Sequence, residues 1–296
     1  MMATKSRIQI VSILAGLFRS VAQDHPDDLT ATVYLCSNRL APPFQAAMVL
    51  GVGGSIISQA ISEATGMSPA AMKSAYQRLG DIGDVAQEAR SSMRTLSDIF
   101  SSSVSKKAKT LTVADVYNKL CSLAKIKGPG STLSKRNLLR DLLVACREHE
   151  ARYLVRTAVG NLRVGAVGVT TVVALAHAFY TGNPEGLPAA VASLKACYSR
   201  CPDYGQLVQA LLDGGIDECA RRFASIRPGT PLVPMLGKIT RGLEEIVHRF
   251  SGHLIACDCK YDGQRAQVHV FGDGQVKIFS RHLENMTEKV RFFFSP

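Results

Sequence analysis

Acidic residues are few in this sequence compared with basic ones. Of its 296 residues, 24 are Asp or Glu and 35 are Lys or Arg, which gives a net charge of +11. Such an excess indicates an anionic partner, either a nucleic acid or a membrane surface. The segment from Arg90 to Arg140 alone holds eleven Lys or Arg against two Asp. Solvated helix faces would give the same pattern, so charge alone does not identify the partner.

The eight cysteines lack the paired C-x-x-C spacing of a zinc site. Three residues separate Cys197 from Cys201, and one separates Cys257 from Cys259. We therefore expect no metal site and no disulfide framework in this chain. Reduced, mostly buried thiols are typical of a cytosolic or nuclear protein.

Neither a membrane-spanning segment nor a secretory segment is expected in this sequence. The uncharged stretch between Arg163 and Glu185 is interrupted by Gly165, Gly168 and His177, and is expected to be a buried helix rather than a membrane span. The apolar run 8–18 resembles a signal peptide in composition, but its helical spacing predicts the first helix of a domain.

Alternation of period two is absent before residue 250, whereas apolar residues recur at helical spacing over 6–225. Helices are predicted at 29–40, 55–64, from Pro69 with Ser68 as its cap, and at 112–126, 133–148, 150–158, 167–180, 204–212 and 217–223. The sequence thus predicts an all-α domain over residues 1–225.

The composition changes at Arg227, where Pro228, Pro231 and Pro234 favour extended backbone. A helix is predicted at 242–250, followed by strands at 253–259, 264–271 and 275–280. The turn 272–274 between the last two strands reads Gly-Asp-Gly, a hairpin signal. Residues 226–296 are therefore predicted to begin an α/β domain.

Two glycine-rich segments could approach a phosphate. Residues 51–54 lack the Gly-Lys-Ser/Thr ending of a phosphate-binding loop and follow no predicted strand, so they are predicted to form a turn. Residues 160–165 read Gly-Asn-Leu-Arg-Val-Gly and separate two predicted helices. Their spacing is compatible with a plain interhelical turn or with a turn that binds phosphates without reading base sequence.

The densest concentration of reactive groups lies near the end of the chain. Lys260 follows an apolar run, 254–257, that is expected to be a buried strand. Burial and the nearby Arg265 would both lower the pKa of this lysine and favour its neutral, nucleophilic form. Asp258 and Asp262 stand at alternating positions on either side and could accept hydrogen bonds from a ligand.

Residues 260–265, Lys-Tyr-Asp-Gly-Gln-Arg, resemble the nucleophile motif of ATP-dependent DNA ligases, most closely the eukaryotic ligase I type. Residues 277–281, Lys-Ile-Phe-Ser-Arg, extend the resemblance. A lone Lys-x-Asp-Gly also fits RNA ligases and capping enzymes, but the long helical region argues against these alternatives. The resemblance implies an all-α DNA-binding domain followed by a nucleotidyltransferase domain.

In that family a Gly-x-Leu-Arg-Leu-Gly loop contacts the DNA backbone and minor groove. Gly160, Arg163 and Gly165 match this loop, while Asn161 replaces a residue that is usually basic. The implied partner is nicked double-stranded DNA, bound by a monomer in the nucleus, with the mitochondrion as an alternative location.

The resemblance also implies the chemistry. Lys260 would attack the α-phosphorus of ATP, Arg265 and Arg281 would hold the ribose and phosphates, and Asp258 would stand at an adenine-contacting position usually held by Glu. The family's ligands for Mg²⁺ and its lysine pair come from segments beyond those matched here. We therefore expect that this chain does not seal nicks unaided. The alternative is a non-catalytic DNA-binding protein that uses the helical region.

Overall fold

The computed structural model describes residues 6–45, 48–100, 110–147, 149–165, 168–235, 237, 239–259 and 262–290, with the backbone alone for 93–100. Among these residues, helices follow one another from Arg7 to Arg222. Both strands and two further helices come after this helical region. The predicted fold class, a helical region followed by the first strands of an α/β region, is confirmed.

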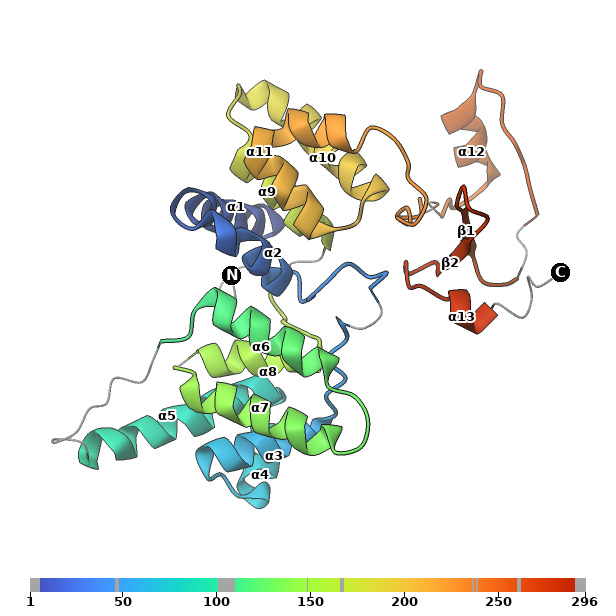
Figure 1. Cartoon of the computed structure of the whole chain (residues 1–296). Helices are drawn as coiled ribbons and strands as arrows, with labels where there is room; N and C mark the ends of the chain where they lie inside the picture. Colours follow the sequence, from blue (N-terminus) through green and yellow to red (C-terminus); the bar gives the residue numbers. More distant parts are fainter. Residues whose placement is uncertain are drawn as a thin grey trace.

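One lobe of the helical region is built from both of its ends (Figure 1). This first lobe contains α1 (Arg7–Asp24), the short turn η1 (Pro26–Asp28), α2 (Leu29–Cys36), α9 (Gly168–Phe179), η3 (Pro184–Gly186), α10 (Leu187–Arg200) and α11 (Tyr204–Arg222). Leu14 and Phe18 of α1 are fully buried and share a core with Leu175 of α9 and Leu207 of α11. Leu14 and Phe18 are four residues apart, which places both on one face of α1.

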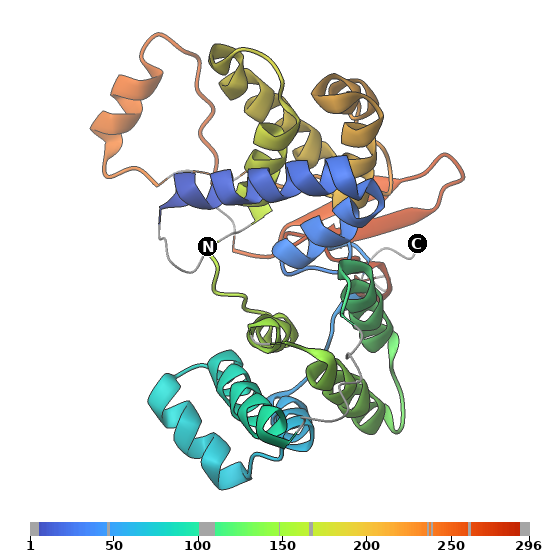
Figure 2. The same cartoon turned by 90° about the vertical axis from the view of Figure 1, so that its left-hand side faces the viewer.

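The second lobe comes from the middle of the helical region. It contains α3 (Gly54–Thr65), α4 (Pro69–Leu79), α5 (Ile82–Phe100), α6 (Val113–Lys125), α7 (Ser131–Ala145) and α8 (Glu150–Val159). Ile61, Val85, Leu123, Leu142 and Val155 belong to its core. Figure 2 shows α1 and the yellow helices on one side of the molecule and the green and cyan helices on the other. The chain therefore leaves the first lobe after α2 and returns to it through the segment that begins at Gly160.

Local signals in the sequence define several helix ends. The Ser68 hydroxyl accepts a hydrogen bond from the Ala71 N–H at the start of α4, as predicted. Thr112 and Asp115 form a capping box at the start of α6, with a bond of 3.0 Å from the Asp115 N–H to Thr112 Oγ1. Residues 51–53 of the predicted turn precede α3, whereas Gly54 is its first residue, and Lys135 Nζ donates to the Leu50 carbonyl at 2.7 Å.

Two tyrosines join the lobes. Tyr34 of α2 stacks on Tyr117 of α6 with ring centroids 6.0 Å apart. The Tyr117 hydroxyl donates to the Leu40 carbonyl at 2.6 Å, and the Tyr34 hydroxyl donates to Asp203 Oδ1 at 3.0 Å. Tyr34 is buried and Tyr117 half-buried, and stacked rings with bonded hydroxyl groups help to fix the relative position of the elements that carry them.

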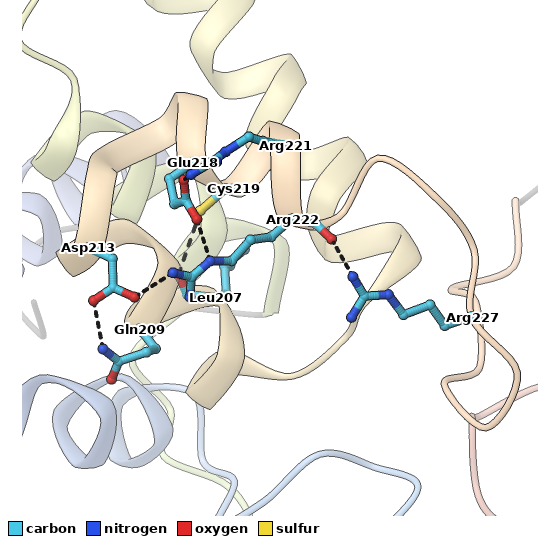
Figure 3. Close-up of polar contacts among 8 residues, drawn as sticks. All are labelled: Leu207, Gln209, Asp213, Glu218, Cys219, Arg221, Arg222 and Arg227. Carbon is cyan, nitrogen blue, oxygen red and sulfur yellow. Dashed lines mark hydrogen bonds and ion pairs between the residues drawn. The ribbon is translucent and has the colours of Figure 1, made fainter.

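Helix α11 is kinked where the sequence predicts a break between two helices. Gly214 and Gly215 leave helical geometry, and Gly215 has a φ of 71°, a region that favours glycine. Figure 3 shows how the segment after the kink is held: Glu218 pairs with Arg221 and Arg222, and Arg222 also lies 2.7 Å from Asp213 Oδ2. Arg227 donates to the Arg222 carbonyl at 3.1 Å, so the chain leaves the helical region from a fixed point (Figure 3).

The C-terminal region contains α12 (Leu243–Phe250), the hairpin strands β1 (Ala266–Val270) and β2 (Val276–Ser280), and the short α13 (Thr287–Val290). The strands pair antiparallel, from Ala266 opposite Ser280 to Val270 opposite Val276. The predicted helix 242–250, the two later strands and the Gly-Asp-Gly turn are confirmed. In Figure 1 these elements lie at one side of the helical lobes.

The strand predicted at 253–259 is wrong. These residues are irregular and exposed, and Leu254 is fully exposed. A strand needs a neighbouring strand for its backbone groups, and the sheet within the described residues consists of β1 and β2. Asp258 Oδ1 instead accepts a bond from the adjacent Cys259 N–H at 2.8 Å, a local contact that competes with strand pairing.

The proline-containing segment 227–234, called the linker here, is bonded to the hairpin and to the first lobe. The Gly229 N–H donates to His269 Nδ1 at 2.9 Å. The side-chain amide of Gln267 makes two bonds to the backbone of Leu232, at 2.9 and 2.6 Å. The Val233 N–H donates to the Ser199 carbonyl of α10 at 2.9 Å, so the linker connects the hairpin to the first lobe.

Candidate nucleic-acid interface and nucleotide site

Residues 160–165 form a loop whose backbone is set by three left-handed conformations. Gly160 ends α8 with φ 85°, Arg163 has φ 53°, and Gly165 has φ 70°. The Asn161 side chain accepts a bond from the Arg163 N–H at 3.2 Å. Glycine adopts such angles without strain, whereas Arg163 needs support from its surroundings.

The loop side chains alternate between the inside and the outside of the molecule. Leu162 and Val164 line a cavity of about 560 Å³ between the lobes, together with residues of α1, α2, α6 and α8. Asn161, Arg163 and Gly165 are exposed. The structure therefore brings the predicted DNA-contacting residues together on one surface, while the two apolar side chains between them are half-buried and face the cavity.

A group of charged residues that the sequence analysis did not assign lies under this loop. Arg163 Nε is 3.2 Å from Asp81 Oδ2, at the entrance to α5. Arg156 of α8 is 3% exposed, and its Nε lies 3.0 Å from Asp81 Oδ1. Arg156 Nη2 lies 3.0 Å from Asp84 Oδ1, and the same Asp84 oxygen lies 2.6 Å from Arg152 Nε. Asp81 and Asp84 are far from the loop in the sequence, so the spacing of the residues gives no indication of this contact.

Asp81 remains a carboxylate although it is buried. Burial raises its pKa, but the Asp84 N–H at 2.8 Å and the Arg156 guanidinium outweigh burial and hold the pKa below its usual value. The helices that carry these groups approach closely at Gly83. A Cβ atom at Gly83 would lie 2.8 Å from the Arg152 carbonyl oxygen and 2.8 Å from Arg156 Cγ.

Several residues of the basic segment 90–140 have structural roles. Arg90 donates to the Cys146 carbonyl at 3.1 Å, and Arg136 pairs with Glu63 at 3.1 Å. In contrast, Lys119, Lys125 and Lys127 are exposed. The charge of this segment is therefore divided between contacts inside the second lobe and a solvated surface that could meet an anion.

The predicted nucleotide site is described in part. Lys260 lies outside the described residues. Arg265 and Arg281 flank the Ala266–Ser280 pair at the open end of the hairpin, and both are exposed. Asp258 is exposed, and the apolar run 254–257 is not buried as expected. The hairpin thus gathers the two arginines at one end, where their guanidinium groups fit the charge of a triphosphate.

The described residues contain no cluster of three or more His, Cys, Asp or Glu side chains placed to hold a metal ion. No helix in the described part of the chain is long and apolar enough to cross a membrane. All eight cysteines are free thiols.

Comparison with known proteins gives two family matches. A family model described as "DNA ligase N terminus" matches residues 1–176, and one described as "ATP dependent DNA ligase domain" matches residues 234–294. These ranges do not test the boundary at 225/226, which stays a prediction.

Individual relatives agree with these matches. The chain is 39% identical to DNA ligase 3 of Schizosaccharomyces pombe over 96% of the chain and 37% of that protein. It is 34% identical to DNA ligase 1 of Saccharomyces cerevisiae over 97% of the chain and 38% of that protein. The corresponding values for a DNA ligase of Pyrobaculum calidifontis are 35%, 96% and 45%. The chain spans less than half the length of each relative. Since the first family model covers more than half of the chain, the chain belongs to the ATP-dependent DNA ligase family.

Proposed function

We propose that this chain provides the DNA-binding region and the nucleophilic lysine of an ATP-dependent DNA ligase that seals nicks in duplex DNA. The observation that carries the proposal is the exposed loop face formed by Asn161, Arg163 and Gly165, held by a buried carboxylate beneath it. Backbone N–H groups and an arginine are the donors that phosphates accept without regard to base sequence.

The loop would bind the DNA backbone. Arg163 offers planar donors that match phosphate oxygens. Helix α9 begins at Gly168, directly after the loop segment, and the N-terminal turn of a helix carries unpaired N–H groups and a partial positive charge. Binding of this kind would be independent of base sequence and would weaken steeply with salt.

ATP would be the second substrate. The neutral amine of Lys260 would attack the α-phosphorus, form a P–N bond and release pyrophosphate, and the AMP group would then pass to the 5′-phosphate at the nick. The 3′-hydroxyl would displace AMP and close the strand. Arg265 and Arg281 would bind the ribose and phosphates, and Asp258 would lie near the adenine. Mg²⁺ would neutralise phosphate charge during these steps.

Labelling with ATP radioactive in its α-phosphate tests the lysine chemistry. We expect the 296-residue chain to retain label through denaturation, and the Lys260→Ala variant to retain none. Lys289→Ala, which removes another exposed lysine of the C-terminal region, is the matched control and should label normally. Equal labelling of wild type and Lys260→Ala would contradict the assignment.

Binding of a fluorescent nicked duplex at low salt tests the loop. We expect Arg163→Ala to weaken binding about tenfold, since a charge-assisted hydrogen bond contributes roughly 1.5 kcal/mol. Arg78→Ala is the matched control, because Arg78 is also exposed and also paired, with Glu88 in the same lobe. If both variants bind alike, the loop is not the DNA contact.

A non-catalytic DNA-binding role is the second candidate. Both large apolar cores lie in the helical region, whereas the segment that leads to Lys260 is exposed. DNA binding that survives Lys260→Ala, together with no labelling of the wild type, would favour this candidate. We also expect that the 296-residue chain alone does not seal nicks, and incubation with ATP, Mg²⁺ and a nicked duplex tests this: sealed product at catalytic protein concentrations would contradict the expectation.

We also propose a monomer that acts in the nucleus, where double-stranded DNA and reduced thiols coincide. Light scattering at micromolar concentration should give a mass near 31.9 kDa. Imaging of a fluorescent fusion should place the protein with nuclear DNA, and a mitochondrial signal would support the alternative location.

A further inference from the structure

Asp81 is the buried charged group beneath the loop to which the proposed function gives no role. Only 5% of it is exposed. Its two oxygens point to different partners: Oδ1 accepts bonds from Arg156 Nε at 3.0 Å and the Asp84 N–H at 2.8 Å, while Oδ2 lies 3.2 Å from Arg163 Nε. One carboxylate thus connects the entrance of α5, the interior of α8 and the loop.

Arg163 needs such a connection if it is to bind a phosphate well. Its side chain is 52% exposed, so the protein surface around it leaves much of its length in solvent. A free arginine side chain samples many rotamers, and ordering it on binding opposes association. The contact with Asp81 is made through Nε, and this leaves the two terminal nitrogens of the guanidinium group to face a ligand.

We propose that Asp81 is a positioning residue for DNA binding, which holds the Arg163 guanidinium group so that its outer edge meets a phosphodiester of the duplex. This inference rests on the proposed DNA-binding role of the loop. Asp81 touches no DNA in this arrangement and acts through Arg163.

The surroundings of Asp81 suit this role. The Asp84 N–H and Arg156 keep it ionised, so the carboxylate can bind an arginine across the physiological pH range. Arg156 is itself held by Asp84 at its other end, so the contact on Oδ1 is fixed independently of the loop. The Asp81–Arg163 contact therefore has a rigid inner side and a solvent-facing outer side.

A role of Asp81 through its charge alone predicts the opposite change in DNA affinity when Asp81 is neutralised. The direction of that change therefore distinguishes the two roles. A carboxylate close to the DNA repels phosphates, so its neutralisation should raise the affinity if Asp81 acts through its charge alone. If Asp81 positions Arg163, neutralisation should lower the affinity although the net charge becomes more positive.

The experiment compares Asp81→Asn with Asp84→Asn in the full 296-residue chain. Both substitutions remove one carboxylate that contacts Arg156, but Asp84 makes no ion pair with Arg163 among the described contacts. Circular dichroism verifies folding, and anisotropy of a fluorescent nicked duplex gives the dissociation constant at several salt concentrations. We expect Asp81→Asn to bind about fivefold more weakly and Asp84→Asn to stay within about twofold of wild type.

The double variant Asp81→Asn/Arg163→Ala shows whether the two residues act together. If Asp81 works through Arg163, the double variant should bind like Arg163→Ala alone. Arg163→Ala should also reduce the slope of log affinity against log salt by about one, since one phosphate contact is lost. Asp81→Asn keeps the Arg163 charge, so its slope should change less.

Arg163→Lys provides a second test should Asp81→Asn fail to fold. Lysine keeps the charge, but its three N–H donors share one nitrogen atom, so it cannot bind Asp81 through one edge and present a planar pair of donors on separate nitrogens to a phosphate. We expect this variant to bind almost as weakly as Arg163→Ala. Affinity within about twofold of wild type would overturn the positioning role, as would unchanged or tighter binding by Asp81→Asn. If Arg163→Ala has no effect, it is the loop assignment itself that fails.

Discussion

At the scale of single residues, four charged side chains hold α5 against α8: Asp81, Asp84, Arg152 and Arg156. A buried ion pair gives little net stability compared with apolar packing, but removing one partner leaves an unpaired charge in the interior. Arg156 is 3% exposed and has two carboxylate partners. Each carboxylate therefore offsets only part of the free-energy cost of burying the Arg156 charge. Substitution of either aspartate should therefore lower stability without abolishing the fold.

The pH dependence of stability should reveal the carboxylate of Asp81. Its pKa lies below the usual value in the folded state, so it stabilises the fold fully above its unfolded pKa of about 3.9, and this stabilisation is lost as the pH falls through the folded pKa. In urea unfolding, Asp81→Asn should be less stable than wild type by ~1–3 kcal/mol at pH 7. The gap should shrink at pH 3. The exposed Asp24→Asn should show a small gap at both pH values, and a gap for Asp81→Asn that does not shrink would contradict this prediction.

Thiol reactivity should separate the cysteines by environment. Burial raises the pKa of Cys146 and of Cys219 to about 12, which leaves little thiolate near neutral pH. Cys257 and Cys259 are exposed, on either side of Asp258. With iodoacetamide at pH 7.5 and peptide mass spectrometry, we expect Cys257 and Cys259 to be modified well before Cys146 and Cys219. Modification of all four at one rate would contradict the described burial.

At the scale of elements, two glycines in helices should respond to alanine in opposite directions. Gly83 lies where α5 and α8 approach, and a Cβ atom there would meet the Arg152 backbone and the Arg156 side chain at 2.8 Å. Gly83→Ala should lower the free energy of unfolding by ~1–3 kcal/mol through overpacking. Gly16 in α1 has open space around the same position. Gly16→Ala should raise the stability by roughly 0.5–1 kcal/mol, because alanine favours helix. Thermal or urea unfolding of both variants measures the difference, and destabilisation by Gly16→Ala would contradict it.

Elements defined by local chemistry could be predicted from the sequence. The cap at Ser68, the helix that begins after Thr112 and the turn at 272–274 each depend on residues within four positions of one another. Even the break in α11 was marked by its two glycines. In these places propensity and hydrophobic pattern agree with the three-dimensional contacts.

Elements that depend on distant partners could not be predicted. The run 254–257 has the apolar character of a buried strand, but a strand also requires a neighbour that its own sequence does not specify. The contact between Arg156 and Asp81 joins residues 75 positions apart, and nothing in the local pattern indicates it. For the candidate site, the loop could therefore be located from the sequence, whereas the carboxylate that supports it could not.

At the scale of the whole molecule, the return of the chain between the lobes gives the loop its place. Helices α9, α10 and α11, which complete the first lobe, follow the helices of the second lobe in the sequence. The segment that begins at Gly160 leads from one lobe to the other, with Leu162 and Val164 facing the cavity between them. A DNA contact on this loop would therefore be sensitive to how the two lobes are arranged.

The position of the hairpin relative to the helical region depends on the linker, and one of its anchors can be titrated. His269 Nδ1 accepts a bond from the Gly229 N–H, and only neutral imidazole can do this. Burial lowers the pKa of His269 below its usual value of about 6.5. This contact is therefore present at neutral pH and above, and is lost as the pH falls through that lowered pKa.

Hydrogen exchange can follow this anchor with an internal control. The Leu232 N–H is held by the Gln267 side chain, which does not titrate. Between pH 7.5 and pH 5, we expect the protection factor of Gly229 to fall more than that of Leu232, after correction for intrinsic exchange rates. In His269→Gln the pH dependence at Gly229 should disappear. If both amides lose protection in parallel in wild type and variant alike, the linker is released by another group, and His269 does not control the attachment of the hairpin to the helical region.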